Sequence, residues 1–358
     1  MRATAGGTER LAARFTEERI PDFYRPAGGE LVASSIGIGT YLGESDDADD
    51  RRYEAALHAA VSAGINVIDA AINYRCQRSE RVIGRVLAAL IDERAARRDE
   101  IIVCTKGGYI PLDGTPPASR EEYNALIERE YFARGVMRPE DVVGGGHCIA
   151  PRYLADQIAR SRANLGLETI DVYYVHNPEQ QIPAVGRETF ARRLVQAFEE
   201  LETRVAAGDI AAYGCATWNG LRVAPDARES LSLEEIVAAA REVAGDSHHF
   251  RYVQLPVNLA MSEALRAPTQ RVAGRDRTAI EAASELGLTV VASASLMQSA
   301  LARSLPAAVR DALPRYDTDA QRALSFVRGA PGITTALVGM RGVKHVAENV
   351  AIAETVLR

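Results

Sequence analysis

Four ionisable side chains lie at or just after the ends of short apolar segments: Asp69, Tyr74, Lys106 and His176. These segments have the length and β-branched content of buried strands: residues 65–71, 101–105 and 170–175. If such strands run parallel in a closed barrel, their carboxyl ends meet at one mouth, where barrel enzymes place their catalytic groups. The spacing therefore predicts that the four side chains converge on one site.

Together the four side chains would form a proton donor. A free tyrosine has a pKa of about 10 and is a weak acid at neutral pH. The Lys106 ammonium would stabilise the phenolate and lower the pKa of Tyr74, while Asp69 would keep Lys106 charged and oriented. His176 would orient or polarise a carbonyl oxygen, or relay the proton. This chemistry suits an oxygen that gains negative charge as hydride reaches carbon, and the hydride must come from a cofactor because no side chain supplies one.

The elements that must position these residues alternate along the chain. The expected strands are residues 35–41, 65–71, 101–105, 170–175, 211–217, 251–256, 288–295 and 334–339. The expected helices are residues 47–63, a helix opened by Ser79, and residues 151–164, 189–207, 233–243, 276–286, 318–328 and 343–357. Strands that are apolar throughout are buried on both faces, which indicates a parallel sheet covered by helices. Without a glycine-rich dinucleotide fingerprint, this α/β pattern favours a closed (β/α)8 (TIM) barrel, and we expect residues 1–358 to form a single domain.

One long insertion interrupts the alternation at residues 109–146. Ser119 and Glu122 form a capping box that predicts a helix within it. An apolar stripe follows at helical spacing: Tyr123, Leu126, Ile127 and Tyr131. Connections this long are usually functional lids or disordered, and the stripe favours a lid. His147 and Cys148 come next, and we interpret them as a packed hinge, since a metal site needs more converging ligands.

Composition excludes several classes of protein. The net charge of −6 argues against nucleic-acid binding. No apolar run reaches the roughly 18 residues of a membrane span, and residues 1–20 lack the apolar core of a signal peptide. The four cysteines form no C-x-x-C pair, which is typical of reduced thiols. We therefore expect a cytoplasmic protein without a metal site.

Several motifs resemble those of the aldo-keto reductases. The matching segments are Gly64–Tyr74 (GINVIDAAINY), Ser79–Gly84 (SERVIG), Thr105–Gly107 (TKG), Asp171–His176 (DVYYVH), Val253-Gln254, Val338–Arg341 (VGMR) and Glu348-Asn349. The resemblance runs from about residue 36 to residue 353. It implies an NAD(P)(H)-dependent carbonyl reductase or alcohol dehydrogenase on a (β/α)8 barrel, with Tyr74 as the acid, Lys106 and Asp69 tuning it, and His176 orienting the substrate.

The resemblance also implies where a cofactor binds. In the family the last strand and helix hold the adenosine phosphate, and this chain has there Gly339, Arg341, Glu348 and Asn349. Arg341, Lys344 and His345 would bring positive charge to a 2′-phosphate, and a helix N-terminus would add backbone donors. This basic patch favours NADP(H) over NAD(H). Gln254 would hydrogen-bond the nicotinamide carboxamide.

Around the nicotinamide the sequence departs from the family pattern. The family often has Ser-Asn after the fifth strand, where this chain has Ala216-Thr217. After the seventh strand the family commonly has Tyr-Ser-Pro-Leu, with the tyrosine stacked under the nicotinamide; here the segment runs from Ser293 to Leu296 (SASL). Trp218 would replace that ring or line the substrate pocket. Tyr109 and Asn177 flank tetrad residues and are candidate substrate contacts.

Other functions remain open at this point. A redox-neutral epimerase or lyase that uses bound nicotinamide transiently would fit the altered contacts at Ala216, Thr217 and Ser293. A regulatory subunit resembling channel-associated β subunits would retain the tetrad and bind cofactor. A metal-dependent hydrolase would need a His-x-His after the first strand, and residues 36–41 have none. The family's usual tail over the pocket has no counterpart after the last expected helix, so we expect the insertion to close the pocket. The expected partner is a small carbonyl or alcohol; the substrate's identity and the oligomeric state stay open.

Overall fold

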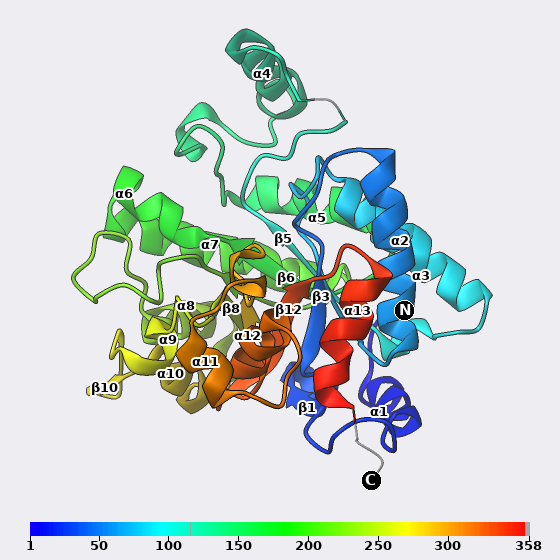
Figure 1. Cartoon of the computed structure of the whole chain (residues 1–358). Helices are drawn as coiled ribbons and strands as arrows, with labels where there is room; N and C mark the ends of the chain where they lie inside the picture. The colour runs from blue at the N-terminus through cyan, green and yellow to red at the C-terminus, as the bar shows by residue number, and fades with distance from the viewer. Residues whose placement is uncertain (115, 355–358) are drawn as a thin grey trace.

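Eight parallel strands form the centre of the molecule (Figure 1). The structure, a computed structural model, describes residues 1–114 and 116–354. The barrel strands are β3 (Ile36–Gly39), β4 (Val67–Asp69), β5 (Ile102–Gly107), β6 (Ile170–His176), β7 (Ile210–Ala216), β8 (Phe250–Pro256), β11 (Thr289–Ser293) and β12 (Ile333–Gly339). They pair in this order, and β12 pairs with β3 to close the barrel. The predicted (β/α)8 barrel is confirmed.

Helices surround the barrel. They are α2 (Asp47–Ser62), α3 (Arg78–Asp92), α5 (Pro151–Leu165), α7 (Arg187–Ala206), α8 (Leu233–Ala244), α10 (Ala279–Glu285), α12 (Asp319–Arg328) and α13 (Val343–Val350). Strand residues such as Ile68, Val103 and Tyr173 pack in the core cluster under the helices. A second cluster contains the strand residues between them: Val67, Ile102, Cys104, Val172 and Tyr174. Because both faces of each strand are buried, the strands are apolar throughout.

Several helix boundaries differ from the prediction. The helix expected to open at Ser79 begins at Arg78, and the Ser79 hydroxyl donates to the Thr40 carbonyl oxygen (2.8 Å) instead of capping α3. The helix predicted over residues 276–286 starts later, because β10 (Arg275–Arg277) pairs with β9 (Gln270–Val272). The last helix ends at Val350 and is followed by a 3-10 turn over Ala351–Ala353. Its predicted end at residue 357 lies outside the described residues.

Several elements have no counterpart in the prediction. The helix α1 (Ala5–Arg14) and the hairpin of β1 (Tyr24–Ala27) and β2 (Leu31–Ser34) precede the barrel. The hairpin turn closes the amino-terminal end of the barrel, where the Tyr252 hydroxyl donates to the Gly28 carbonyl oxygen (2.8 Å). Short helices lie in the loops: α6 (Ile182–Val185), α9 (Glu263–Arg266) and α11 (Ala307–Ala312). Within the described ranges, no helix combines the length and the apolar character that crossing a bilayer requires.

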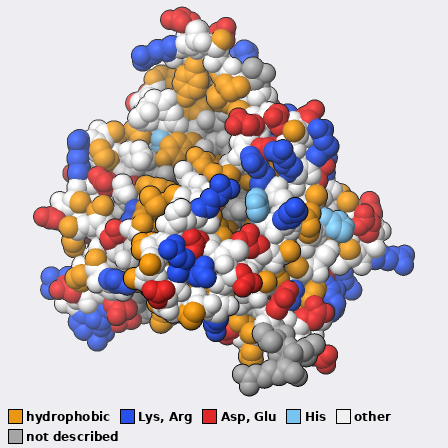
Figure 2. Space-filling model, viewed as in Figure 1, with side chains coloured by type: hydrophobic (Ala, Val, Ile, Leu, Met, Phe, Trp, Pro, Cys, Tyr) orange, Lys and Arg blue, Asp and Glu red, His pale blue; other side chains and the backbone are white. Residues whose placement is uncertain are grey.

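The insertion forms a lobe with a small apolar core of its own. It contains the predicted helix, α4 (Arg120–Ile127), which continues into a π-helical turn over Glu128–Phe132. Ile127, Tyr131 and Met137 pack against Tyr153 of α5. Figure 1 shows α4 at the top, apart from the barrel, and hydrophobic side chains are visible on the lobe and on the barrel below it in Figure 2.

A buried ion pair stabilises the amino-terminal end of the barrel. The Asp171 carboxylate, at the start of β6, accepts from Arg98 Nη2 (2.7 Å) and from the backbone N–H groups of Ala3 (2.6 Å) and Val103 (2.8 Å). Both side chains of the pair are buried. The contacts of Asp171 join the N-terminal segment, β5 and β6 at the end of the barrel opposite the predicted site. Removing one partner of the pair would leave a buried charge unpaired, which is strongly destabilising.

Replacing this carboxylate should therefore destabilise the fold and leave the chemistry intact. We expect Asp171→Asn to lower the free energy of unfolding by roughly 3 kcal/mol, because the Arg98 guanidinium stays buried without a counter-charge. Thermal and urea unfolding measure the loss. Glu168→Gln, which removes an exposed carboxylate nearby, is the control and should change stability by less than about 0.5 kcal/mol. A fall in turnover of the folded Asp171→Asn protein would contradict this assignment.

Candidate active site

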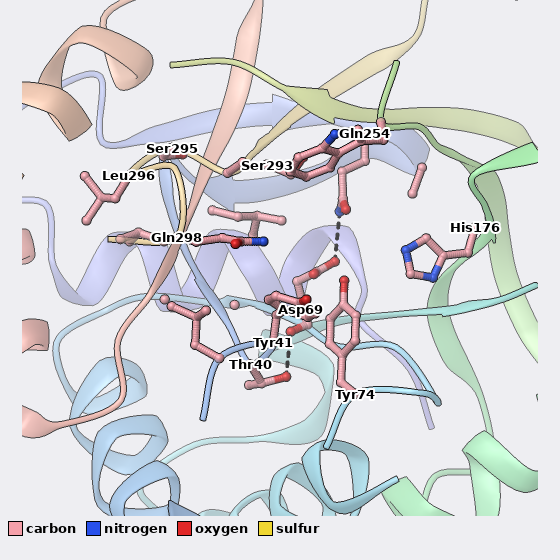
Figure 3. Close-up of a pocket in the computed structure, with 18 of the residues that line it drawn as sticks. Thr40, Tyr41, Asp69, Tyr74, His176, Gln254, Ser293, Ser295, Leu296 and Gln298 are labelled. Carbon is pink, nitrogen blue, oxygen red and sulfur yellow. Dashed lines mark hydrogen bonds between the residues drawn. The ribbon is translucent and has the colours of Figure 1, made fainter. Parts of the chain in front are cut away.

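A cavity of about 450 Å³ lies at the carboxyl ends of the barrel strands. Of the residues predicted for the site, those that line it are Asp69, Tyr74, Tyr109, His176, Asn177, Thr217, Trp218, Gln254, Ser293, Leu296 and Gly339. They come from strand ends and the loops that follow, as expected for a barrel. Figure 3 shows Asp69, Tyr74, His176 and Gln254 converging on one side of this cavity.

Lys106 lies beneath the cavity and joins two of the predicted catalytic residues. Its side chain is 1% exposed. Its Nζ donates to Asp69 Oδ2 (2.6 Å), to the Ala70 carbonyl oxygen (2.8 Å) and to the Tyr74 hydroxyl (3.4 Å). An ammonium has three donors, so the three contacts use all of them.

The Asp69 carboxylate is held from both sides. Its second oxygen, Oδ1, accepts from Gln254 Nε2 (2.9 Å), which reaches it from β8 (Figure 3). The Thr40 hydroxyl donates to the Asp69 carbonyl oxygen (3.0 Å). Gln254 was predicted to bind the nicotinamide carboxamide; its amide nitrogen is engaged with Asp69, which leaves its carbonyl oxygen for a ligand.

The pKa values of the buried pair differ from the expectation. Burial is the largest influence on Tyr74 and raises its pKa; Lys106 lowers it, Asp69 raises it, and the net direction is upward. Lys106 thus acts in the predicted direction, but its effect is outweighed because burial removes more hydration from the phenolate than one ammonium replaces. Burial alone would lower the pKa of Lys106, but Asp69 and Tyr74 together raise it. At neutral pH the pair is thus a protonated phenol beside a charged ammonium.

His176 lies beside Tyr74 as a neutral imidazole. Burial, followed by the charge of Lys106, lowers the pKa of His176 well below its usual value. Its ring is edge-on to the rings of Tyr74 (6.0 Å between centroids) and Tyr109 (5.0 Å). Its Nδ1 is buried and has no hydrogen-bond partner among the described residues. A neutral imidazole carries one N–H, which suits orienting a carbonyl oxygen.

The predicted cofactor residues separate into two groups. Thr217, Ser293, Leu296 and Gly339 line the cavity, whereas the residues near and on α13 do not: Arg341, His345, Glu348 and Asn349. Arg341 Nη1 pairs with Asp49 Oδ2 (3.2 Å), so its charge is already matched by a carboxylate that the sequence did not point to. The buried Asn349 side chain leaves its Oδ1 without a partner in the described part of the chain.

Some lining residues were missed by the prediction. Thr40, Tyr41, Asn73, Ser295, Gln298 and Ser299 also line the cavity. Thr40 and Tyr41 follow β3, so the rule that identified Asp69 applies to them too, and the Tyr41 ring is edge-on to Tyr74 (5.0 Å). Gln298 extends into the cavity in Figure 3, from a loop with left-handed backbone at Met297, Gln298 and Ser299. Neither apolar periodicity nor residue type predicts that this loop brings Gln298 into the cavity.

The insertion, which we expected to close the cavity as a lid, contributes little to the cavity lining. Of residues 109–114 and 116–146, only Tyr109 lies among those lining the cavity. Its hydroxyl accepts from Asn177 Nδ2 (2.9 Å), so the two candidate substrate contacts hold each other. Closure of the site by the rest of the insertion stays a prediction.

A buried carboxylate shapes the loop that carries Trp218. Glu179, in a 3-10 turn over Pro178–Gln181, accepts at Oε1 from the backbone N–H groups of Trp218 (2.6 Å), Asn219 (3.1 Å) and Gly220 (3.4 Å). Trp218 is 41% exposed and lines the cavity mouth. Glu179 therefore sets how the indole faces the site.

This contact has an optical readout because the chain contains a single tryptophan. We expect Glu179→Ala to free the loop, shifting the Trp218 emission to longer wavelength and increasing its quenching by acrylamide. Gln180→Ala, which removes an exposed neighbour, should leave the spectrum unchanged. Identical spectra for Glu179→Ala and the wild type would show that the loop keeps its shape without the carboxylate.

Comparisons with known proteins agree with this geometry. Residues 35–241, more than half of the chain, match the aldo/keto reductase family. A D-threo-aldose 1-dehydrogenase from a Pseudomonas species is 29% identical over 54% of this chain and 51% of its own length. An L-glyceraldehyde 3-phosphate reductase from Escherichia coli is 28% identical over 44% and 36%. The chain thus spans about half or less of the curated relatives that it matches.

Solved structures share the fold along almost the whole chain. An aldo/keto reductase from Klebsiella pneumoniae in complex with NADP and acetate has a TM-score of 0.62 at 20% identity, covering 94% of this chain and 91% of that one. A glycerol dehydrogenase from Gluconobacter oxydans has a TM-score of 0.63 at 19% identity, covering 93% and 90%. From the matched profile, the barrel and the convergence of the four polar residues, we conclude that this chain belongs to the aldo/keto reductase family.

Proposed function

We propose that the protein is an NAD(P)(H)-dependent oxidoreductase that interconverts a carbonyl group and an alcohol, with Tyr74 as the proton donor. The observation that carries the proposal is the contact of a buried, paired ammonium with a phenol that opens onto the cavity, 3.4 Å from Lys106 Nζ to the Tyr74 hydroxyl. Family membership supports it. A bound nicotinamide would supply the hydride.

Each residue of the group has a defined task in this proposal. Tyr74 donates its hydroxyl proton to the carbonyl oxygen as that oxygen becomes an alkoxide. Lys106 stabilises the phenolate that remains, and Asp69 keeps Lys106 charged and in place. His176, as a neutral imidazole, orients the carbonyl oxygen toward Tyr74. In the direction of alcohol oxidation the same groups take the proton back.

Polar groups that line the cavity fit a nicotinamide cofactor. The Gln254 carbonyl oxygen is available to a carboxamide, and Ser295 keeps a buried hydroxyl without a partner in the described residues. We propose NADP(H) rather than NAD(H), because Lys344 and His345 are exposed beside the Arg341–Asp49 pair. The NADP complex of the Klebsiella pneumoniae structure agrees with this choice.

The charge of the cavity favours an uncharged substrate. Of the described residues that line it, Asp69 alone carries a charged side chain. The nearby ammonium of Lys106 is buried and committed to Asp69. The mouth is aromatic, since Tyr41 is 53% and Trp218 41% exposed. We therefore propose that the substrate is a neutral carbonyl compound. It would resemble an aldose, as in the name of the Pseudomonas relative, more than the phosphorylated aldehyde in the name of the Escherichia coli relative.

Cofactor binding and proton donation are tested separately. NADPH should quench the Trp218 emission, and neutral aldehydes should cause its oxidation, followed at 340 nm. Tyr74→Phe should bind NADPH as the wild type does and lose roughly a hundredfold or more in kcat, because the acid is removed while the cavity keeps its shape. Tyr24→Phe, which removes a hydroxyl bound to the Gly64 carbonyl oxygen far from the cavity, is the control. Full activity of Tyr74→Phe would exclude this residue as the acid, and NADPH binding without oxidation by any carbonyl would favour a redox-neutral or regulatory function.

Substrate charge is tested with a matched pair of aldehydes. We expect kcat/KM for glyceraldehyde to exceed that for glyceraldehyde 3-phosphate by at least about tenfold, because a phosphate would meet Asp69 and no free cation among the described residues that line the cavity. Steady-state kinetics at a fixed, saturating NADPH concentration measure the ratio. Equal values, or a preference for the phosphorylated aldehyde, would contradict the proposed substrate class.

A further inference from the structure

A second histidine lies behind His176 and outside the cavity. His147 follows the insertion and is 2% exposed. Both of its ring nitrogens have partners: Nε2 lies 2.7 Å from the His176 carbonyl oxygen, and Nδ1 lies 2.8 Å from Gln181 Nε2. Burial lowers the pKa of His147 to about 4, so the ring is neutral at neutral pH and carries a single proton. Which nitrogen holds that proton follows from the next residues in the chain of contacts.

Arg193 fixes the direction of these hydrogen bonds. Arg193 Nη1 donates to Gln181 Oε1 (2.6 Å), and a guanidinium cannot accept. The Gln181 oxygen must therefore face Arg193, and its NH2 group donates to His147 Nδ1. As a result, His147 carries its proton on Nε2 and donates it to the His176 carbonyl oxygen. The chain of donors runs from Arg193 through Gln181 and His147 to His176.

The first member of this chain also binds the insertion. Arg193 Nη2 donates to the Glu140 carbonyl oxygen (2.7 Å), and Nη1 lies 3.4 Å from the Asp141 carbonyl oxygen. Arg193 belongs to α7. Its guanidinium therefore joins this barrel helix to the insertion and to the hydrogen-bonded chain of Gln181, His147 and His176. The end of the insertion is thereby tied to the catalytic histidine.

Packing around His147 leaves little room for other arrangements. The Tyr109 ring is edge-on to both histidine rings, with centroids 5.0 Å from each. A Cβ at Gly108 would lie 2.7 Å from the His176 carbonyl oxygen and 3.1 Å from His147 Nε2. A displacement of His147 would thus move the main chain that carries His176.

We propose that His147 is a positioning residue that fixes His176 beside Tyr74, and that the Arg193–Gln181–His147 chain makes this placement depend on the insertion. The inference rests on the proposed function for its kinetic consequence, since His176 orients the carbonyl oxygen there. Displacing an orienting group by even one ångström costs up to about a hundredfold in rate. His147 itself touches neither the cavity nor the Tyr74 hydroxyl, so its effect passes through His176.

Substitutions at His147 separate hydrogen bonding from packing. We expect His147→Leu to lower kcat roughly tenfold to a hundredfold with an unchanged Kd for NADPH, since the relay ends at His176 and not in the cofactor groove. His147→Gln retains an N–H donor of similar reach and should recover most of the lost rate. Equal rates for the two variants, or loss of NADPH binding in step with kcat, would overturn the proposal.

Arg193 provides a test that does not depend on the buried ring. Arg193→Met should lower kcat in the wild-type background and have no further effect in His147→Leu, because both act on one chain. Arg192→Met is the matched control: the neighbouring arginine pairs with Glu188 on the exposed side of the same helix and should leave kcat unchanged. Additive losses for Arg193→Met and His147→Leu would mean that the two residues act independently.

A measurement without turnover distinguishes this proposal from the proposed function. The chain has six histidines, and side-chain 15N NMR at pH 7 distinguishes the two neutral tautomers. The signal absent from His147→Leu should be the Nε2–H tautomer in the wild type, and it should change in Arg193→Met. If the protein shows the Nε2–H tautomer at His147 but reduces no carbonyl, only the proposed activity is disproved. An Nδ1–H tautomer at His147 disproves the relay.

Discussion

The burial of the Lys106 ammonium is the constraint on which the site depends. A charge taken out of water needs a counter-charge and a partner for each donor. The barrel supplies these by placing the end of β4 next to that of β5, so that Asp69, the Ala70 carbonyl oxygen and Tyr74 surround one nitrogen. Gln254, from the far side of the barrel, holds the remaining Asp69 oxygen. The phenol is thereby located by the same contacts that make the buried charge tolerable.

The sequence sufficed for the barrel and for the convergence of the four polar residues. Continuous apolar strands and the rule that strand ends meet at one mouth carried both predictions. The sequence did not predict contacts between residues that are distant along the chain. Asp49, paired with Arg341, and Gln254, paired with Asp69, have no local pattern that reveals those partners. The direction of the Tyr74 pKa depends on a balance between burial and one ammonium, which residue types alone do not give.

Two loops shape the cavity around Tyr74, the proposed acid. The loop after β7 is shaped by Glu179, and the loop after β11 contains successive residues in left-handed backbone. Both loops bring side chains to the cavity, among them Trp218 and Gln298. In the proposed function, these loops would set selectivity and the position of the cofactor, while the strand ends would hold the group around Lys106.

The hydrogen bonds of Arg193 to the described part of the insertion go to main-chain oxygens, those of residues 140 and 141. Such a tether does not depend on which amino acids supply the two carbonyls. The side chains at residues 140 and 141 can therefore change without loss of this tether, provided that the backbone there keeps its path. For protein engineering, residues 140 and 141 form one attachment point that is defined by backbone geometry, whereas the side chains that pack against Tyr153 form a second one that depends on composition.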